Sequence, residues 1–349
     1  MRSHRQNMGK DTHRYFFPTL GVAGGGGATL ALSAATTGAG QTVTLQRITP
    51  TGGTATVSWG DGSTSTIANG NTGTTTHVYA SAGTYAISIS NPSILTYIDL
   101  RDTKLSFNSV ALVGCIALAS LRVDISGTFN SADIVMCPLT FMHIYFPVAG
   151  TYTFNSSHIA AMSLTYLYVY FPVAGTYTFN SSHIAAMSLT SLTLYTTTAG
   201  TYTFNSSHVS AMLLTYLYIY MTVAGTYTFN STHIAARTTI TNVTVVLHAT
   251  NTFTVARADW DGFPACGTIR VEAALSQAQV DNLLLGLWDG FATKTVNAGT
   301  VDLLGQSNAA PSGILQAQCP PTTGYEAAYE LTTDSCGVSS KHWTSVTTA

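Results

Sequence analysis

The chain has 349 residues and a formal net charge of −2, and only 8% of its residues are charged, against about 25% in ordinary soluble domains. This charge gives no basic surface for nucleic acid, and the absence of a long apolar run argues against a membrane span. Solubility must come from Ser, Thr, Asn and Tyr. That composition favours a β-rich extracellular, cell-surface or virion protein over a cytosolic enzyme.

Residues 1–27 predict an N-terminal arm followed by a glycine-rich hinge. The start is basic, as in a secretory signal, but Pro18 and the glycines at 24–27 interrupt the apolar stretch, and no A-x-A site follows. The glycines favour a flexible hinge and lack the Gly-Lys-Ser/Thr continuation of a phosphate loop. We expect the arm to dock on a neighbouring subunit. Its candidate contact residues are Arg2, Arg5, Arg14, Tyr15, Phe16 and Phe17.

Residues 28–91 predict a small all-β domain, with strand candidates at 42–48, 54–59, 74–79 and 84–90 between turn-rich segments. The motif that stands out is Trp59-Gly60-Asp61-Gly62, followed by His77-Val78-Tyr79 and Gly83-Thr84-Tyr85. This pattern resembles the PKD domain, although the family's W-x-F-G-D-G is contracted here. The resemblance implies an immunoglobulin-like β-sandwich.

Two expectations follow for this domain. The Asp61-Gly62 pair favours a tight hairpin turn over a calcium site. The domain is expected to cap the repeat region that follows, because the first turn of a repeat array would otherwise expose an apolar end.

A repeat of 25 residues runs from Phe146 to about Val245, with further copies that begin at Phe171, Thr196 and Met221. A fixed period of this length predicts a solenoid, because one unit cannot bury its apolar face alone and must stack on its neighbours. Each copy ends in an L-x-x-L-x-L pattern, which predicts a short strand with alternate residues pointing inward. The same template fits nine segments, which start at Leu95, Leu118, Leu139, Leu164, Leu189, Leu214, Ile240, Cys266 and Ala298.

Residues 92–305 therefore resemble the leucine-rich repeats of internalin-like and BspA-like bacterial surface proteins. The resemblance implies a mainly β chain built as a parallel β-solenoid of about nine turns, with one strand-lined face. The Asn that normally follows the strand in this family is missing, and Tyr or Thr stands in its place. The Asn-Ser-Ser step of each return segment offers an alternative ladder.

A helix is predicted at 276–288, between the last two strands of the solenoid. Ser276 and Gln279 form a capping box, four apolar residues share one face, and Gly290 provides a stop. Residues 306–349 are expected to form a C-terminal cap with a helical turn at 325–331 and a closing strand at 342–346. Cys319 and Cys336 in this tail can pair. Free buried thiols are the favoured interpretation for Cys115, Cys137 and Cys266.

The solvent side of the predicted strands is rich in aromatic residues. A grid of tyrosines at the inter-strand spacing predicts a flat amphipathic platform that stacks on sugars or meets another protein surface. The alternative is that tyrosines cover the sheet only as good strand formers. The candidate binding or assembly residues are Phe141, His143, Tyr145, Tyr166, Tyr168, Tyr170, Tyr195, Tyr216, Tyr218 and Tyr220.

Two further ladders run through the four central copies. His158, His183, His208 and His233 suit a metal site or an acid switch, but a structural role within the turn is favoured, and no metal or other cofactor is expected. The Asn-x-Ser/Thr steps at Asn155, Asn180, Asn205 and Asn230 match glycosylation sequons. An asparagine ladder that tightens each turn is the favoured interpretation.

Catalysis finds little support, because no G-x-S-x-G or H-E-x-x-H motif occurs. A paired-carboxylate glycosidase site stays open at Asp259, Asp261 and Asp289. The sequence predicts a non-enzymatic structural subunit of a virion or extracellular fibre, whose partners are copies of itself or other surface proteins. The alternative is a receptor- or glycan-binding adhesin that uses the same aromatic face.

Overall fold

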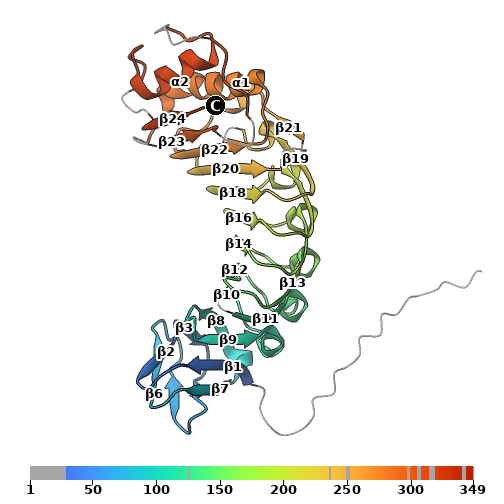
Figure 1. Ribbon diagram of the computed structural model, residues 1–349, viewed down its shortest axis with the longest axis vertical. Helices are drawn as coiled ribbons and strands as arrows, with labels where there is room; N and C mark the ends of the chain where they lie inside the picture. Colours follow the sequence, from blue (N-terminus) through green and yellow to red (C-terminus); the bar gives the residue numbers. More distant parts are fainter. Residues whose placement is uncertain are drawn as a thin grey trace, which may run out of the picture.

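The computed structural model describes residues 29–124, 126–235, 237–248, 252–296, 299–304, 308–313, 319–339 and 343–348. The predicted arm of residues 1–27, with its basic and aromatic contact residues, lies outside this part of the chain. The fold is mainly β, with 40% strand against 19% helix. A curved stack of turns joins a β-domain at one end to a helical cap at the other (Figure 1).

The N-terminal β-domain consists of seven strands in two layers. One layer has the antiparallel order β1-β7-β4-β5, and the other includes the antiparallel pair β2-β6. The strands are β1 (Thr29–Thr36), β2 (Gln41–Leu45), β3 (Arg47–Pro50), β4 (Ala55–Ser58), β5 (Thr64–Ile67), β6 (Thr75–Tyr79) and β7 (Gly83–Ser90).

The strand prediction for this domain was wrong at three places. The segment 42–48 is two strands, since β2 pairs with β6 whereas β3 leaves for the solenoid and pairs with β8. Strands β1 and β5 lie where no strand was expected. In β1 the inward positions include small residues such as Ala34 beside Leu30 and Leu32. The local strand propensity is therefore weak, and β1 forms a strand because its alternate residues are buried in the core.

A strand lies at each of the nine template positions of the solenoid, and all nine form one parallel sheet. Its register places equivalent residues side by side, so that Leu167 pairs with Leu192 and Leu192 with Leu217. The strands are β8 (Leu95–Leu100), β10 (Ser120–Val123), β12 (Phe141–Tyr145), β14 (Tyr166–Phe171), β16 (Ser191–Thr196), β18 (Tyr216–Met221), β20 (Asn242–Leu247), β22 (Thr268–Glu272) and β23 (Thr300–Asp302).

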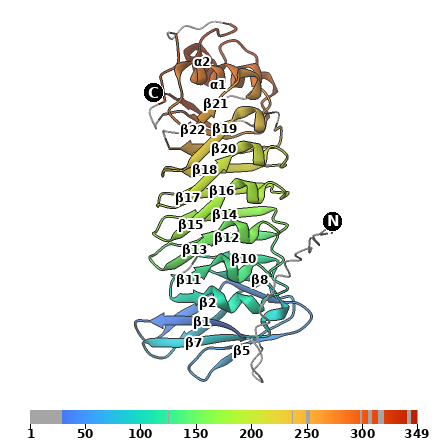
Figure 2. The ribbon, with the colours of Figure 1, turned by 90° about the vertical axis from the view of Figure 1, so that its right-hand side faces the viewer.

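A second parallel sheet, which the sequence analysis did not predict, is formed by the return segments on the outer side of the curve (Figure 2). It contains β9 (Leu105–Asn108), β11 (Ser126–Asn130), β13 (Thr151–Asn155), β15 (Thr176–Asn180), β17 (Thr201–Asn205), β19 (Thr226–Asn230) and β21 (Thr252–Thr254). A short 3₁₀ helix follows each of these strands and closes the turn. The first sheet lines the concave side of the arc (Figure 1).

Both solenoid sheets continue into the N-terminal domain. Strand β1 pairs antiparallel with β9, and β3 pairs antiparallel with β8. The end of the solenoid is therefore hydrogen-bonded along both of its edges. Strands of the N-terminal domain therefore cover the first turn of the solenoid, and the two sheets end at β3 and β5.

The core lies between the two sheets and repeats with each turn. Leu167 and Val169 point inward from the concave sheet, and Tyr177 and Phe179 from the outer sheet. The Tyr177 hydroxyl donates to the Val173 carbonyl, and its ring occupies the space beside Gly175, where a Cβ would lie 2.4 Å from the ring. A glycine is required there by the tyrosine two residues later.

The C-terminal end is closed by two helices and a last strand. Helix α1 (Gln277–Asp289) begins at the predicted capping box and ends at Gly290, and α2 (Gly324–Thr333) packs against it. Strand β24 (Ser345–Thr347) extends the concave sheet beside β23. Cys319 and Cys336 form a disulfide, and Cys115, Cys137 and Cys266 are free and buried.

Candidate functional site

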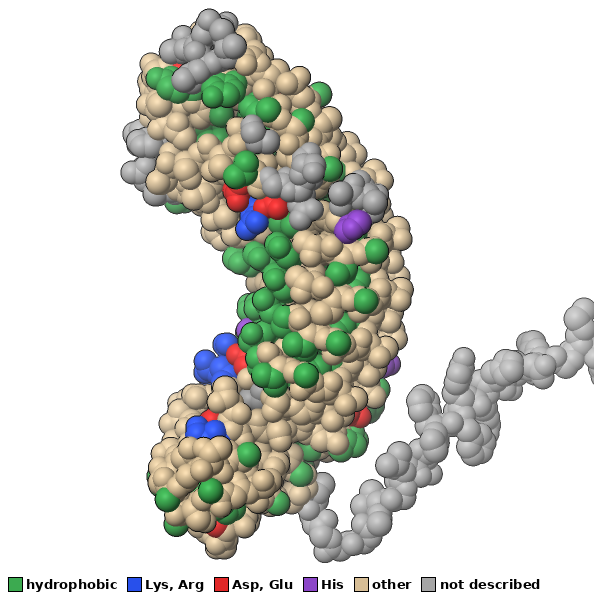
Figure 3. Space-filling model, viewed as in Figure 1, with side chains coloured by type: hydrophobic (Ala, Val, Ile, Leu, Met, Phe, Trp, Pro, Cys, Tyr) green, Lys and Arg blue, Asp and Glu red, His purple; other side chains and the backbone are tan. Residues whose placement is uncertain are grey.

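The concave face is defined here as the solvent-directed residues of β12, β14, β16 and β18, because alternate residues of a strand point away from the core. Its residues form three columns that run from strand to strand. The structure brings all ten predicted face residues together on it, and apolar side chains cover the inner curve (Figure 3). The columns are Phe141-Tyr166-Ser191-Tyr216, His143-Tyr168-Thr193-Tyr218 and Tyr145-Tyr170-Tyr195-Tyr220.

The rings of the concave face stack on one another. The ring centroids of Phe141 and Tyr166 are 4.3 Å apart with planes at 9°, and those of His143 and Tyr168 are 4.0 Å apart with planes at 1°. The third column continues this pattern from Tyr170 on, with the Tyr195 centroid 4.0 Å from that of Tyr170 and 4.7 Å from that of Tyr220, whereas the Tyr145 ring stands at 86° to the Tyr170 ring. The prediction of a flat platform was wrong, because stacked rings cover each other's faces and present their edges and hydroxyls to solvent.

Two of the three columns are broken at the same strand. Ser191 and Thr193 of β16 stand where β14 and β18 carry tyrosines, and we call this pair of positions the interruption. The third column passes it unbroken through Tyr195. Ring faces that are covered elsewhere on the concave face are therefore left without a ring partner beside β16.

Charged groups lie at the two ends of the concave face, and sequence reasoning missed them. At one end Asp124 lies between Arg122 and His143, with its carboxylate oxygens 3.1 Å and 3.0 Å from their nitrogens. Burial alone would raise the pKa of Asp124, but the contacts with His143 and Arg122 hold it below its usual value. At the other end Arg270 pairs with Glu272 and Asp302. The signal was present, since Arg122 and Arg270 continue the column of Tyr168 into the diverged repeats.

The outer edge is defined here as the outer strands β13, β15, β17 and β19 together with the 3₁₀ helix that follows each of them. The histidine ladder links consecutive turns along this outer edge. His208 Nδ1 lies 2.8 Å from Oγ of Ser181 in the preceding turn, and that fully buried hydroxyl also accepts from the Asn205 backbone N–H at 2.8 Å. The same pair recurs as Ser131–His158, Ser156–His183 and Ser206–His233. The favoured structural interpretation is consistent with these contacts, although the partner belongs to the neighbouring turn.

At both ends of this ladder an aspartate replaces the histidine. Ser109 Oγ lies 2.5 Å from Asp133 Oδ2, and Ser231 Oγ lies 2.5 Å from Asp259 Oδ2. The aspartate accepts from the serine hydroxyl at both ends, and we infer that the histidine Nδ1 accepts from the serine in the same way between them.

The asparagine ladder caps the 3₁₀ helices. In each turn the Asn Oδ1 accepts from the backbone N–H two residues further on, as Asn180 does from Ser182 at 2.9 Å. This Asx turn satisfies a donor that the start of the helix leaves open.

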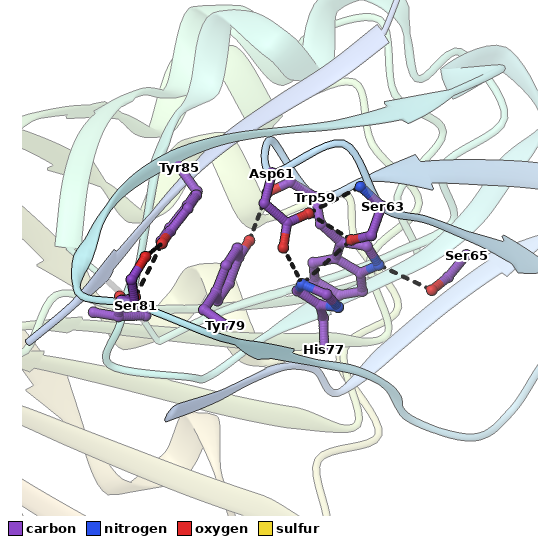
Figure 4. Close-up of polar contacts among 9 residues, drawn as sticks. Trp59, Asp61, Ser63, Ser65, His77, Tyr79, Ser81 and Tyr85 are labelled. Atoms are coloured by element: carbon purple, nitrogen blue, oxygen red, sulfur yellow. Dashed lines mark hydrogen bonds and ion pairs between the residues drawn. The ribbon is translucent and has the colours of Figure 1, made fainter. Parts of the chain in front are cut away.

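In the N-terminal domain the Trp-Gly-Asp-Gly motif forms the hairpin turn between β4 and β5 (Figure 4). The Asp61 carboxylate accepts from the backbone and hydroxyl of Ser63 and lies 2.6 Å from His77 Nε2. These hydrogen bonds, those of Ser63 first, lower the pKa of Asp61. The Tyr79 hydroxyl donates to the Trp59 carbonyl at 2.7 Å, so the second half of the motif holds the first in place.

Two of the three carboxylates considered for catalysis are engaged in separate contacts. Asp259 is buried against Ser231, and Asp289 forms two hydrogen bonds with Arg257 at 2.6 Å and 2.7 Å. Asp261 is exposed.

The family model described as PKD domain matches residues 27–90. PKD domains occur in extracellular proteins. No curated protein and no solved structure matches the chain. Across the described residues, no helix combines the length and apolar character needed to cross a membrane.

Proposed function

We propose that this chain is a non-enzymatic, surface-displayed structural protein that makes its contacts through the concave face. The observation that carries the proposal is the concentration of partly exposed rings on one surface of a repeat stack. Contiguous aromatic surface of this kind usually meets a partner. The match of residues 27–90 to a domain found in extracellular proteins supports display outside a cell or on a virion.

The favoured role is a subunit of a fibre or filament. Two concave surfaces do not fit each other, so a second copy would have to offer its convex side. Such a head-to-tail contact does not close on itself unless its rotation happens to make a ring, and it therefore builds filaments. The arm of residues 1–27 is a second proposed contact.

We also assign the solenoid to the leucine-rich-repeat type. The support is the L-x-x-L-x-L template at each concave strand, with a 3₁₀ helix in the return segment, as leucine-rich repeats have.

The second candidate is a receptor- or glycan-binding adhesin. It is favoured by the interruption, because this part of the concave face leaves ring faces without a ring partner. A ligand-binding face stays open in the isolated protein, whereas an assembly face is covered by another copy.

Light scattering on the purified chain tests the structural role. The full chain is expected to form assemblies, whereas a chain without residues 1–27 and a Tyr195→Arg variant at the centre of the concave face are expected to remain monomers. Thr72→Arg, on an exposed loop of the N-terminal domain, is the matched control and should assemble normally. A monomeric full chain would overturn the fibre role and leave the adhesin.

A further inference from the structure

The interruption is bordered by tyrosine rings on both sides. On β14, Tyr166 and Tyr168 have one face covered by Phe141 and His143, and their other faces are directed toward β16. On β18, Tyr216 and Tyr218 lie on the opposite side of β16. Within the described part of the chain, no ring contact joins Tyr166 to Tyr216 or Tyr168 to Tyr218.

On each side of the interruption, the bordering tyrosine of the second column is close to parallel with its neighbour in the third column. Tyr168 lies at 11° to Tyr170, which lies at 14° to Tyr195. On the other side, Tyr218 lies at 19° to Tyr220, which lies at 8° to Tyr195. Both rings therefore turn a face along the column, and Tyr195 stands beside the space between them. Two strand intervals separate them, roughly 9.6 Å, which is the spacing that one intervening ring requires.

The same place is rich in hydroxyls that make no hydrogen bond among the described residues. They belong to Tyr166, Tyr168, Ser191, Thr193, Tyr216 and Tyr218. The phenols are neutral at physiological pH because the ordinary pKa of tyrosine is about 10, and burial raises the pKa of all four tyrosines further, that of Tyr168 to about 12. Thr193 itself is 7% exposed and forms the floor between the taller rings.

We propose that the interruption is a subsite for one neutral pyranose ring of a saccharide, which completes the two broken columns. A pyranose has apolar C–H faces for the two tyrosine faces and equatorial hydroxyls for the hydroxyl groups around them. An aromatic side chain of a protein partner would fill the space but leave those hydroxyls unmatched. A nucleotide would bring phosphate, and the arginines at the ends of the concave face already pair with carboxylates.

This inference rests on the glycan-binding form of the proposed function, and blocking the subsite tests it. The probes are maltohexaose, cellohexaose, chitohexaose and mannohexaose, titrated into the full chain by calorimetry. At least one is expected to bind the wild type. Thr193→Tyr and Ser191→Tyr should each lower its affinity at least tenfold, because they place in the interruption the residue that β14 and β18 carry. Their melting temperatures should match that of the wild type.

Ser157→Tyr, the same kind of change at an exposed position of the outer edge, is the matched control and should bind as the wild type does. Tyr218→Ser, which removes one bordering ring, should also weaken binding. The inference is overturned if none of the four saccharides binds, or if Thr193→Tyr binds as tightly as the wild type. Assembly that Tyr195→Arg abolishes, without saccharide binding, would overturn the inference alone. Absence of any contact through the concave face would overturn the proposed function as well.

Discussion

The outer edge and the concave face differ in how far the four central copies agree. On the outer edge, β13, β15, β17 and β19 share the sequence Thr-Tyr-Thr-Phe-Asn, and a serine follows each of them. On the concave face the equivalent triplets are Phe-His-Tyr, Tyr-Tyr-Tyr, Ser-Thr-Tyr and Tyr-Tyr-Tyr. One side of the stack repeats without change while the other varies.

The contacts explain this difference. The serine directly after each of these strands is buried and bonds both the backbone and the histidine or aspartate of the next turn, so a change there affects two turns at once. Most concave side chains contact neighbouring rings, His143 also contacts the Asp124 carboxylate, and a small residue in one column leaves the backbone pairing intact. We infer that the outer edge stabilises the stack, whereas the concave face determines what the stack contacts.

The largest expected effect is on the outer edge. Ser181→Ala leaves the Asn205 N–H and the His208 Nδ1 without their partner, and we expect the free energy of unfolding to fall by about 2–3 kcal/mol. Ser182→Ala is the matched control, because its side chain is exposed and surface changes of this kind stay within about 0.5 kcal/mol. Urea unfolding measures both. Equal effects at the two neighbouring serines would contradict a stabilising role for the ladder.

Gly175→Ala should be the next most destabilising. The new Cβ would lie 2.4 Å from the Tyr177 ring and 2.9 Å from the Tyr152 carbonyl oxygen, and overpacking of this kind costs about 1–3 kcal/mol. At Gly267 the nearest atom to a new Cβ is 3.9 Å away, so Gly267→Ala serves as control. Thermal unfolding compares the melting temperatures of the two variants, and equal melting temperatures would contradict the prediction.

The identity of the ladder acceptor should matter less than its presence. His208→Ala removes the acceptor for Ser181 and should cost about 1 kcal/mol. His208→Asp copies the ends of the ladder, where Asp133 and Asp259 accept from serine, and should retain most of the stability. If the aspartate variant unfolds as easily as the alanine variant in urea, the ladder depends on the imidazole itself.

The concave strands could be predicted because their inward residues follow one template in nine copies. Helix α1 could be predicted because Ser276 and Gln279 form a local start signal. The template assigns one strand to each copy and leaves the rest as a return segment, so it does not predict the outer sheet. The signal was present, because Thr-Tyr-Thr-Phe alternates polar and aromatic residues as a strand does. Pairing of β3 with β8 depends on tertiary contacts that no local pattern encodes.

The residues that belong to the concave face could also be predicted, but the orientation of their rings could not. Alternation along a strand places Tyr166 and Tyr168 on the solvent side. Whether their rings lie flat or stack depends on side-chain torsions and on the rings of the next strand. The partner of each histidine required the register between turns, which places Ser181 beside His208 although they are 27 residues apart.

The smallest expected effect is at the charged end of the concave face. Asp124→Asn removes the carboxylate that lies between Arg122 and His143, and a partly exposed ion pair contributes about 0.2–1 kcal/mol. The folded-state pKa of Asp124 is lowered, so its contribution is complete above the unfolded value, about 3.9, and is lost as pH falls through the folded value. Urea unfolding at a series of pH values should therefore show a wild-type advantage at pH 7 that vanishes in acid.

Asp261→Asn, at an exposed position, controls for loss of a negative charge alone and should track the wild type at every pH. A constant difference between Asp124→Asn and the wild type across the series would show that the carboxylate acts by packing and not by charge. If Asp124→Asn lowered the free energy of unfolding as much as Ser181→Ala does, the concave face would stabilise the stack as much as the outer edge does. That result would remove the division of roles, because variation on the concave face is tolerated only if its side chains contribute little to holding the turns together.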